Sequence, residues 1–191
     1  MPLILATRNE HKLREFRRLL SVTELQLLPD AVVLPPETGE TFIENALDKA
    51  RAAAGQTGLA AIADDSGIAA DALGGRPGVR SARYAGEGAS DAQNLALLIE
   101  EVPPGSALHY VCALVHVDPL RGEEHVFERH CDGVMAQTPR GSRGFGYDPV
   151  FVPADDPTGR TMAELSDAEK DAISHRGRAL RALEAWLTAP G

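Results

Sequence analysis

The stretch that decides the fold is 108–134, LHYVCALVHVDPLRGEEHVFERHCDGV, which contains two long strand-like runs around a short polar turn. The runs, 108–117 and 124–134, have the length and many of the residue types of β-strands. Asp118-Pro119-Leu120-Arg121-Gly122 between them is typical of a hairpin connection. Because hairpins join antiparallel strands, the sheet that contains this stretch is not purely parallel.

On both sides of this hairpin, strand patterns alternate with helix patterns. Further strands are predicted where short apolar runs occur, at 3–7, 24–28, 59–63 and 150–152. Loops are predicted where glycine and proline gather, at 35–39, 74–88 and 139–147. The alternation predicts an α/β fold with a mixed sheet.

Four helices are predicted between these strands. The first carries Leu13, Phe16 and Leu20 at helical spacing on one face. The other three open with a capping box, in which Ser or Thr is followed three residues later by Glu or Gln. These pairs are Thr41 with Glu44, Ser90 with Gln93, and Ser166 with Glu169. The last helix is predicted to continue without a break to about residue 187.

The composition is that of an ordinary folded chain of 191 residues, with 43% hydrophobic and 25% charged residues. This length suits a single domain over 1–191, or two apposed lobes. The net charge of −9 argues against a protein that binds nucleic acid through its phosphates. The two cysteines, Cys112 and Cys131, are too few for a disulfide framework or a zinc site.

Neither a membrane span nor a secretion signal is predicted. No apolar run approaches the ~20 residues that cross a bilayer. Residues 1–5 lack the basic start and the long apolar stretch of a signal peptide. We therefore expect a cytoplasmic protein that acts neither at a membrane nor on nucleic acid.

The first candidate site is Ala6-Thr7-Arg8-Asn9-Glu10-His11-Lys12, where a strand ends and a helix begins. Backbone N–H groups at a helix N-terminus bind phosphate, and Thr7, Asn9 and two basic side chains add hydrogen bonds and charge. An ordinary helix cap with solvated basic residues is the alternative. The chain contains neither a Walker phosphate loop nor the glycine fingerprint of dinucleotide-binding folds.

Carboxylates mark two further candidate sites, Glu37 in a proline-glycine loop and Asp64-Asp65-Ser66-Gly67 after a strand. Mg²⁺ prefers one or two carboxylates together with waters and substrate phosphates, which matches this sparse supply. Adjacent side chains of a strand point to opposite faces, so only one of the two aspartates is expected to face a given site. A plain polar turn is the alternative for the second site.

Two more candidate sites lie in the last third of the chain. Gly144-Phe145-Gly146-Tyr147-Asp148-Pro149 places an aromatic ring between glycines, where a base could stack on it. On the last predicted helix, Lys170 and Ser174 are four residues apart on one face, beside His175 and Arg176. A solvated helix face is the alternative for this basic cluster.

Together these segments resemble the Ham1 family of inosine/xanthosine triphosphate pyrophosphatases. The matching motifs are long and follow one another in order over essentially the whole chain. The three lysines of the chain all fall on positions of these family motifs. The motifs are Ala6-Thr7-x-Asn9-x-x-Lys12, Glu37-Thr38-Gly39-x-Thr41-Phe42-x-Glu44-Asn45-Ala46, Ala63-Asp64-Asp65-Ser66-Gly67, Asp71-Ala72-Leu73-Gly74-Gly75-x-Pro77-Gly78-Val79-x-Ser81-Ala82-Arg83-Tyr84, Gly144-Phe145-Gly146-Tyr147-Asp148-Pro149 and Ser174-His175-Arg176-Gly177.

The resemblance implies an elongated mixed β-sheet flanked by helices, in two lobes with the active-site cleft between them, and a homodimer. It implies Mg²⁺-dependent hydrolysis of the purine nucleoside triphosphates ITP, dITP and XTP to the monophosphate and pyrophosphate. Glu37 and Asp65 are then the metal ligands, and Asp65 also accepts a proton from the attacking water. The implied substrate contacts are Thr7, Arg8, Asn9, Lys12 and Lys49 at the phosphates, Ser66 beside Asp65, Phe145, Gly146, Tyr147 and Asp148 around the base, Lys170 on the nucleotide, and His175 and Arg176 facing the base.

Selectivity is expected to come from position 6 of the purine. Hypoxanthine and xanthine present the acceptor O6 there, whereas adenine presents a donor, so a donor such as Arg176 favours the former. GTP also has O6, and the sequence does not show which residue rejects it. The chain departs from many family members at Arg8, where glycine is common, and at Pro36, where some carry a second acid.

Two other functions stay open at this point. One is a hydrolase of a related fold that acts on modified pyrimidine nucleotides or on methylated bases. The other is a nucleotide sensor that binds its ligand without turnover. A substrate panel and a test of pyrophosphate release distinguish both from the implied activity.

Overall fold

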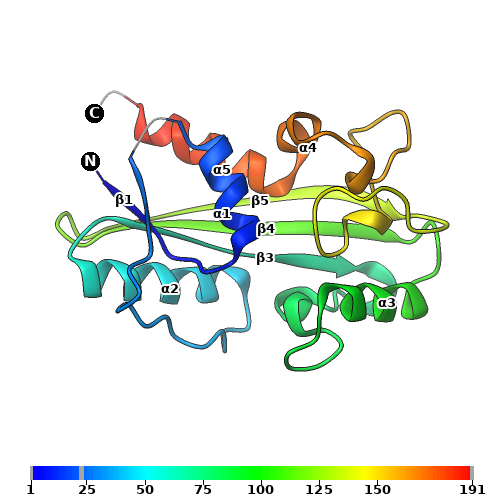
Figure 1. Cartoon of the computed structure of the whole chain (residues 1–191), viewed down its shortest axis with the longest axis horizontal. Coiled ribbons are helices and arrows are strands. Elements are labelled where there is room, and N and C mark those ends of the chain that lie inside the picture. The colour runs from blue at the N-terminus through cyan, green and yellow to red at the C-terminus, as the bar shows by residue number, and fades with distance from the viewer. Residues whose placement is uncertain (1, 22–23, 190–191) are drawn as a thin grey trace. The chain divides into compact units, whose positions relative to one another are not determined.

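The computed structural model describes residues 2–21 and 24–189, and the strands of this part form one six-stranded sheet (Figure 1). They are β1 (Leu3–Leu5), β2 (Leu25–Leu27), β3 (Ala61–Ala70), β4 (Ala107–Asp118), β5 (Glu123–Met135) and β6 (Phe151–Pro153). Their order in the sheet is β2-β1-β3-β4-β5-β6. β1 is parallel to β2 and β3 whereas β5 and β6 are antiparallel, so the predicted α/β fold with a mixed sheet is confirmed.

Five α-helices accompany these strands in the described ranges. They are α1 (Glu10–Leu19), α2 (Phe42–Thr57), α3 (Asp91–Glu101), α4 (Asp167–Ile173) and α5 (His175–Leu187). The three predicted capping boxes are confirmed, at Thr41, Ser90 and Ser166. Within the described residues, no helix is both long enough and apolar enough to cross a membrane.

The chain divides into two compact units. Unit 1 contains Met1–Asp65, Cys112–Arg129 and Arg176–Gly191. Unit 2 contains Ser66–Val111 and His130–His175. Strands β3, β4 and β5 contribute residues to both units, so each unit has its own part of the sheet and its own core.

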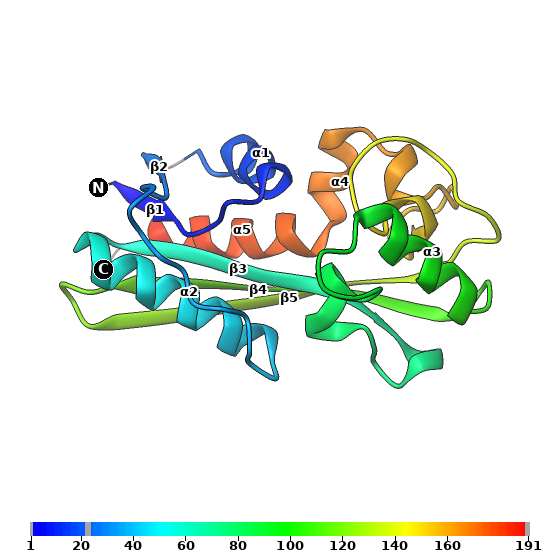
Figure 2. The same ribbon diagram turned by 60° about the horizontal axis from the view of Figure 1, so that its bottom comes forward.

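Unit 1 has a hydrophobic core on each face of its strands, because successive strand side chains point to opposite sides. On one face, small side chains of α2 pack against β1, β3 and β4. The side chains of α2 are Ala46, Ala50, Ala53 and Ala54, and those of the strands are Ile4, Ala61, Ala63, Ala113 and Val115. On the other face lie α1 and α5, through Leu13, Phe16, Leu180 and Leu183 against Leu3, Leu5, Ile62 and Leu114. Figures 1 and 2 both show α2 across these strands from α1 and α5.

Unit 2 has one buried cluster that joins α3, the strands and the loops around β6. Its members include Leu98 and Val102 of α3, Ile68, Leu108 and Phe151 of the strands, and Tyr147, Val150, Met162 and Leu165 of the loops. Since Tyr147 and Val150 belong to this core, the glycine-rich segment before them is attached to a packed part of the unit.

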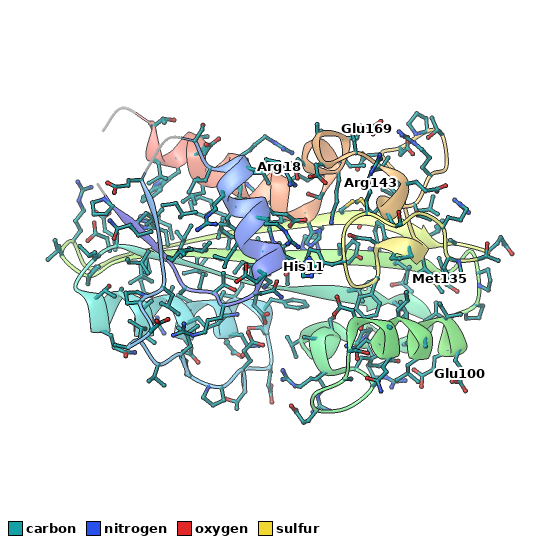
Figure 3. All side chains as sticks on the ribbon, viewed as in Figure 1. His11, Arg18, Glu100, Met135, Arg143 and Glu169 are labelled. Carbon is teal, nitrogen blue, oxygen red and sulfur yellow. The ribbon has the colours of Figure 1, made fainter. Side chains whose placement is uncertain are left out.

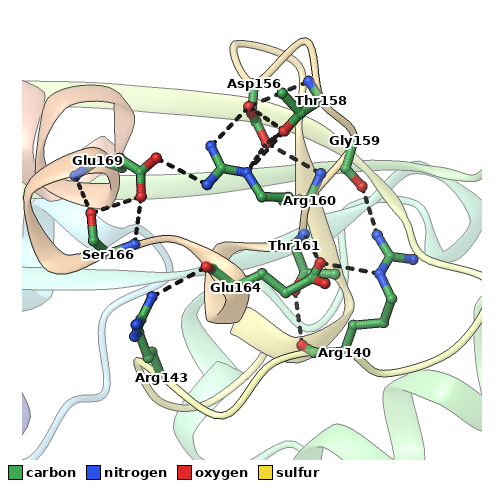
Figure 4. A network of polar contacts seen from close by, with 10 residues as sticks. All are labelled: Arg140, Arg143, Asp156, Thr158, Gly159, Arg160, Thr161, Glu164, Ser166 and Glu169. Atoms are coloured by element: carbon green, nitrogen blue, oxygen red, sulfur yellow. Dashed lines mark hydrogen bonds and ion pairs between the residues drawn. The ribbon is translucent and has the colours of Figure 1, made fainter.

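A surface network fixes the loop between β6 and α4 (Figure 4). Arg160 pairs with Asp156 at 3.2 Å and with Glu169 of α4 at 2.9 Å. Arg140 pairs with Glu164 at 3.1 Å and donates to the Gly159 carbonyl at 2.6 Å. Exposed pairs contribute little individually, and their use here is to hold a long connection in one conformation.

The predicted end of this strand at residue 63 is wrong, and so is the alternative of a polar turn at Asp64-Asp65-Ser66-Gly67, because β3 continues through these residues to Ala70. Both aspartates are buried inside the strand and their charges are compensated there by cations, as described below. Gly67 has no positive φ; instead a Cβ at this position would lie 2.6 Å from the Gly78 carbonyl oxygen. The glycine thus permits a close approach within a strand and does not form a turn.

The expected single C-terminal helix is also wrong, because it is broken at Ser174. This residue has φ −65° and ψ 154°, and its N–H donates to the Lys170 carbonyl at 2.8 Å to end α4. Serine is favoured immediately before a helix, and α5 begins at His175. Lys170 and Ser174 therefore do not share one face of a continuous helix.

Candidate active site

The expected phosphate-binding segment forms the start of α1 in unit 1. Asn9 Oδ1 accepts hydrogen bonds from the backbone N–H groups of His11, at 2.9 Å, and Lys12, at 3.1 Å. Thr7 Oγ1 accepts from the N–H of Asn9 at 3.2 Å. Figure 3 labels His11 on this first turn. The turn is capped from within the chain, which the alternative interpretation of this segment predicted.

Arg8 is directed away from this turn and toward segment 29–32. Its Nη2 donates to the carbonyl oxygen of Val32 at 2.9 Å and to those of Pro29 and Asp30 at 3.3 Å. Its Nη1 lies 3.6 Å from the carboxylate of Asp30. The guanidinium thus ties the start of α1 to the segment that follows β2, a contact that its place in the motif did not indicate.

Asp64 is the centre of a buried ionic network in unit 1. Its Oδ2 lies 3.0 Å from Lys12 Nζ and 3.1 Å from Arg176 Nη2. Arg176 also bonds to Glu15 of α1 through Nη1. Burial alone would raise the pKa of Asp64, but the charges of Lys12, Arg176 and Lys49 together hold this pKa well below its usual value. The carboxylate is therefore charged at neutral pH and compensates two cations.

Asp65 has different hydrogen-bond partners, as strand alternation predicted for adjacent residues. Its Oδ2 accepts from Asn45 Nδ2 at 3.0 Å, and its Oδ1 lies 3.9 Å from Lys49 Nζ. Burial raises the pKa of the Asp65 carboxyl; Lys49 and Lys12 oppose this rise and Glu37 adds to it. A carboxylate with a raised pKa is a better proton acceptor than an ordinary surface carboxylate.

Lys49 connects the two expected metal ligands. From α2, its Nζ lies 2.5 Å from Glu37 Oε1 and 2.8 Å from the backbone oxygen of Asp64, in addition to its contact with Asp65. Burial is the largest influence on the Lys49 pKa and lowers it, but the charges of Asp65, Glu37 and Asp64 outweigh burial and raise this pKa. Lys49 is thus a buried ammonium held among carboxylates.

The oxygens of Glu37 and Asp65 fit a hard divalent cation. The two carboxylates approach one ammonium, and the repulsion between them contributes to the raised pKa of Asp65. The described residues contain no group of three or more His, Cys, Asp or Glu side chains able to hold a metal ion. Mg²⁺ needs no such group, since waters and substrate phosphates complete its octahedral coordination.

In unit 2, Asp148 is the centre of a second buried network. Its Oδ2 accepts from Lys170 Nζ at 2.6 Å and from the backbone N–H of Phe145 at 2.9 Å. Its Oδ1 accepts from the hydroxyl of Tyr110 at 3.1 Å. The Lys170 ammonium also lies 5.0 Å from the centre of the Phe145 ring, within cation–π range. Asp148 therefore sets the positions of both Phe145 and Lys170.

The other expected base contacts lie around this network. Tyr147 is buried and donates its hydroxyl to the Ser81 carbonyl at 2.7 Å, so its side chain belongs to the core of unit 2. The N–H of Gly146 donates to Asp91 at 3.1 Å. His175 is buried and stacks on the Tyr110 ring, with centroids 4.6 Å apart. Ser66 is partly exposed on β3.

The expected site residues therefore fall into two sets. Unit 1 contains the expected phosphate and metal contacts, together with Arg176, and unit 2 contains Ser66, Phe145, Gly146, Tyr147, Asp148, Lys170 and His175. Within each unit a buried aspartate contacts part of the set: Asp64 contacts Lys12 and Arg176 in unit 1, and Asp148 contacts Phe145 and Lys170 in unit 2.

The family model described as the Ham1 family matches residues 3–186. The chain belongs to the Ham1 family. This Ham1 chain is 53% identical to the dITP/XTP pyrophosphatase of Frankia alni, over 98% of this chain and 97% of that protein. It is similar to the structure of a HAM1 protein from Coxiella burnetii, with a TM-score of 0.86 and 41% identity over 98% of both chains. It is also similar to the nucleoside-triphosphatase / dITP/XTP pyrophosphatase from Mycobacterium abscessus, with a TM-score of 0.75 and 47% identity over 99% of this chain and 100% of that one.

Three buried residues of this Ham1 chain were not singled out from the sequence. Asn45 follows the capping box of α2, and the structure bonds it to Asp65. Glu15 of α1 is buried beside the apolar face that Leu13 and Phe16 define, and no local pattern indicates its burial. Tyr110 lies in the middle of an apolar strand, where nothing in the sequence distinguishes it from a core residue.

Proposed function

We propose that this chain hydrolyses the non-standard purine nucleoside triphosphates ITP, dITP and XTP to the monophosphate and pyrophosphate. The observation that carries the proposal is the cluster of Glu37, Lys49 and Asp65 in unit 1, in a chain 53% identical to a dITP/XTP pyrophosphatase over nearly its full length. Two carboxylates beside a buried ammonium are the groups that metal-assisted hydrolysis of a phosphoanhydride uses. The reaction removes these nucleotides from the pool available to polymerases.

Glu37 and Asp65 are the proposed ligands of Mg²⁺. Their oxygens are the donor type that Mg²⁺ prefers, and their number leaves coordination positions for water and phosphate. When bound, Mg²⁺ neutralises phosphate charge and increases the acidity of water. Chelation by EDTA is expected to abolish turnover and added Mg²⁺ to restore it, whereas full activity in metal-free buffer would contradict this assignment.

The proposed phosphate contacts are the side chains of Thr7, Asn9, Lys12 and Lys49, with Arg8 fixing the segment that carries them. Lys12 and Lys49 are part-buried or buried ammonium groups beside Asp64 and Asp65. They offset the negative charge of the triphosphate, since phosphoryl chemistry depends more on charge neutralisation and positioning than on covalent catalysis. Asp65, whose pKa is raised, accepts the proton of the attacking water.

The proposed base contacts lie in unit 2. The Phe145 ring carries a base by stacking, while Lys170 and His175 contact the nucleotide from α4 and from the start of α5. Asp148 positions Phe145 and Lys170 through the hydrogen bonds given above. Ser66, Gly146 and Tyr147 complete this proposed set. We also propose that the enzyme acts in the cytoplasm as a homodimer.

Selectivity is proposed to come from hydrogen-bond donors to O6 of the purine. Arg176 is the proposed donor, and its bonds to Asp64 and Glu15 fix the position from which it acts. A mismatched buried polar pair costs roughly 1–3 kcal/mol, so one such contact discriminates against adenine by about 5–150-fold. Discrimination against GTP needs a further contact near the 2-amino group.

The test is pyrophosphate release from ITP, dITP, XTP, GTP and ATP under identical conditions with Mg²⁺. The proposal predicts that the first three are preferred over the last two. Preference for a modified pyrimidine or a methylated nucleotide would support a different hydrolase. Tight ITP binding without pyrophosphate release would support a sensor and contradict the proposal.

A further inference from the structure

Asn45 forms two hydrogen bonds that join the expected metal-binding loop to Asp65. Its side chain is buried, with 1% exposure, and it is the fourth residue of α2. Oδ1 accepts from the backbone N–H of Gly39 at 2.8 Å, and Nδ2 donates to Asp65 Oδ2 at 3.0 Å. Gly39 is two residues after Glu37. We propose that Asn45 is a positioning residue that sets the Asp65 carboxylate relative to Glu37, an inference that rests on the proposed function.

The hydrogen bonds of Asn45 decide which oxygen of Asp65 faces the other carboxylate. Oδ2 is held by Asn45, whereas Oδ1 lies toward Lys49, which in turn bonds to Glu37. Partners that hold metal ligands in one orientation commonly act in this way, through a hydrogen bond to the ligand atom that does not bind the metal. Asn45 thus acts on the reaction through Asp65 and does not contact the reacting atoms.

The loop that Asn45 holds is rigid at its other end as well. Glu44 Oε2 accepts from the backbone N–H groups of Glu40, at 2.8 Å, and Thr41, at 3.2 Å. A Cβ at Gly39 would lie 2.8 Å from Asn45 Oδ1, so this close approach requires glycine. The first turn of α2 therefore fixes segment 39–41, and through it the direction from which Glu37 enters the site.

An amide is needed at position 45 because the two partners differ in kind. The Gly39 N–H needs an acceptor, and the Asp65 carboxylate needs a donor. Aspartate could accept from Gly39 but would place a negative charge against Asp65. Alanine would provide neither bond and would leave the part-buried N–H of Gly39 without its side-chain acceptor.

Unit 2 contains a matched control for a purely structural role. Asn94 is the fourth residue of α3 and is also buried, with 2% exposure. Its Oδ1 accepts from the N–H of Ala85 at 2.8 Å, and its Nδ2 donates to the carbonyl of Ala82 at 3.1 Å. Replacing Asn94 removes the same kinds of loop bond without removing a bond to a carboxylate.

The experiment compares Asn45→Ala, Asn45→Asp and Asn94→Ala with the wild-type chain. The readouts are Mn²⁺ affinity from the electron paramagnetic resonance signal of free Mn²⁺, kcat and KM for ITP, and the Tm. Mn²⁺ takes the same oxygen ligands as Mg²⁺. Asn45→Ala is expected to weaken Mn²⁺ binding by roughly 10–100-fold, the usual effect of losing an outer partner of a metal ligand, and to lower kcat more than it raises KM.

The two other variants distinguish a role of Asn45 in positioning Asp65 from a role in the stability of the fold alone. Asn94→Ala is expected to lower the Tm as Asn45→Ala does, while its Mn²⁺ affinity stays at the wild-type value. Asn45→Asp keeps the acceptor for Gly39, so its loop anchor survives, yet its kcat is expected to fall. This variant keeps the test decisive if Asn45→Ala does not fold.

Wild-type Mn²⁺ affinity in Asn45→Ala, wild-type kcat in Asn45→Asp, or an equal loss of Mn²⁺ affinity in Asn94→Ala would each overturn the inference. These outcomes differ from a failure of the proposed function. In that case the wild-type chain itself would release no pyrophosphate from ITP, dITP or XTP, whatever the behaviour of the variants.

Discussion

Helices α2 and α3 begin with the same pattern of hydrogen bonds, but the asparagine at the fourth position of each helix donates to a different kind of partner. In both, an N-cap hydroxyl and a Glu or Gln three residues later form a capping box, and an asparagine follows directly. Each asparagine accepts a hydrogen bond from a backbone N–H of the preceding loop. Asn45 then donates to the Asp65 carboxylate, whereas Asn94 donates to the Ala82 carbonyl.

The comparison distinguishes the hydrogen bonds that fix a loop against a helix from the role of the residues that this loop carries. The local pattern is sufficient to fix a loop against a helix in either unit. At α2, however, the fixed loop carries Glu37, and the asparagine reaches a buried charge beside Lys49. At α3 the asparagine reaches neutral backbone, so the same arrangement has a structural result only. Variants at the two helices and at their partners test this difference.

The largest effect is expected from Asp65→Asn, which removes the charge that Asn45 holds while keeping the shape of the side chain. Loss of a general base alone costs ~10²–10⁴-fold in rate, and weaker metal binding adds to this cost. The decrease should appear mainly in kcat for ITP, with a Tm close to that of the wild-type chain. Steady-state kinetics and a melting curve on the same sample check both statements.

Asp64→Asn should instead affect stability, because Asp64 compensates Lys12 and Arg176 inside unit 1. Removing one partner of a buried ionic group costs about 3–5 kcal/mol in the free energy of unfolding. Denaturant unfolding measures this loss. An inactive but stable Asp64→Asn variant beside a fully active Asp65→Asn variant would reverse the two roles.

The same variant should change how stability depends on pH. The pKa of Asp64 is lower in the folded chain than its usual value, so the unfolded chain binds more protons as the solution becomes acidic. The stabilisation from Asp64 is therefore fully present above the unfolded pKa of about 4 and is lost as the pH falls toward the folded pKa. Asp64→Asn should flatten this acid-dependent part of the stability profile.

A smaller effect is expected from Phe145→Ala in unit 2. Loss of a stacked base costs about 1–3 kcal/mol of binding, which should appear as a higher KM for ITP. Phe127→Ala in unit 1 is the control, since Phe127 packs near Trp186 with centroids 6.0 Å apart and has no proposed contact with substrate. An unchanged KM in Phe145→Ala would show that the ring does not contact the base.

The smallest effects are expected from the two caps, Thr41→Ala and Ser90→Ala. Each should lower the free energy of unfolding by about 1 kcal/mol, the usual cost of losing an N-cap hydroxyl. Only Thr41→Ala should also raise the Mg²⁺ concentration needed for half-maximal ITP hydrolysis, because only α2 anchors the Glu37 loop. An equal Mg²⁺ requirement in the two variants would remove the distinction between the helices.

The local features of the fold could be predicted because they depend on short patterns. Thr41 with Glu44, and Ser90 with Gln93, identify helix starts without knowledge of the rest of the chain. The hairpin at 118–122 likewise indicates a mixed sheet. That Glu37 and Asp65 lie close together could be predicted only from the resemblance of long motifs to a family, since no local sequence rule connects the two residues.

The features that sequence reasoning missed depend on contacts distant along the chain. The network of Asp64 includes Arg176, which is separated from it by 112 residues. The local sequence therefore predicts a strand that ends before the two aspartates, whereas β3 continues through them. Burial of Glu15 depends on the same arginine. The break at Ser174 carries no glycine or proline signal, and it coincides with the point where the chain passes from unit 2 to unit 1.

The central claim is that this Ham1 chain cleaves the bond that releases pyrophosphate from a non-standard purine nucleotide. The most direct test is to incubate the chain with ITP and Mg²⁺ and to identify both products by ion-exchange chromatography. The account predicts IMP and pyrophosphate in equal amounts, with less than about a hundredth of either when the Asp65→Asn variant is used for the same time. Release of IDP and inorganic phosphate, or no product from a chain that binds ITP tightly, would contradict it.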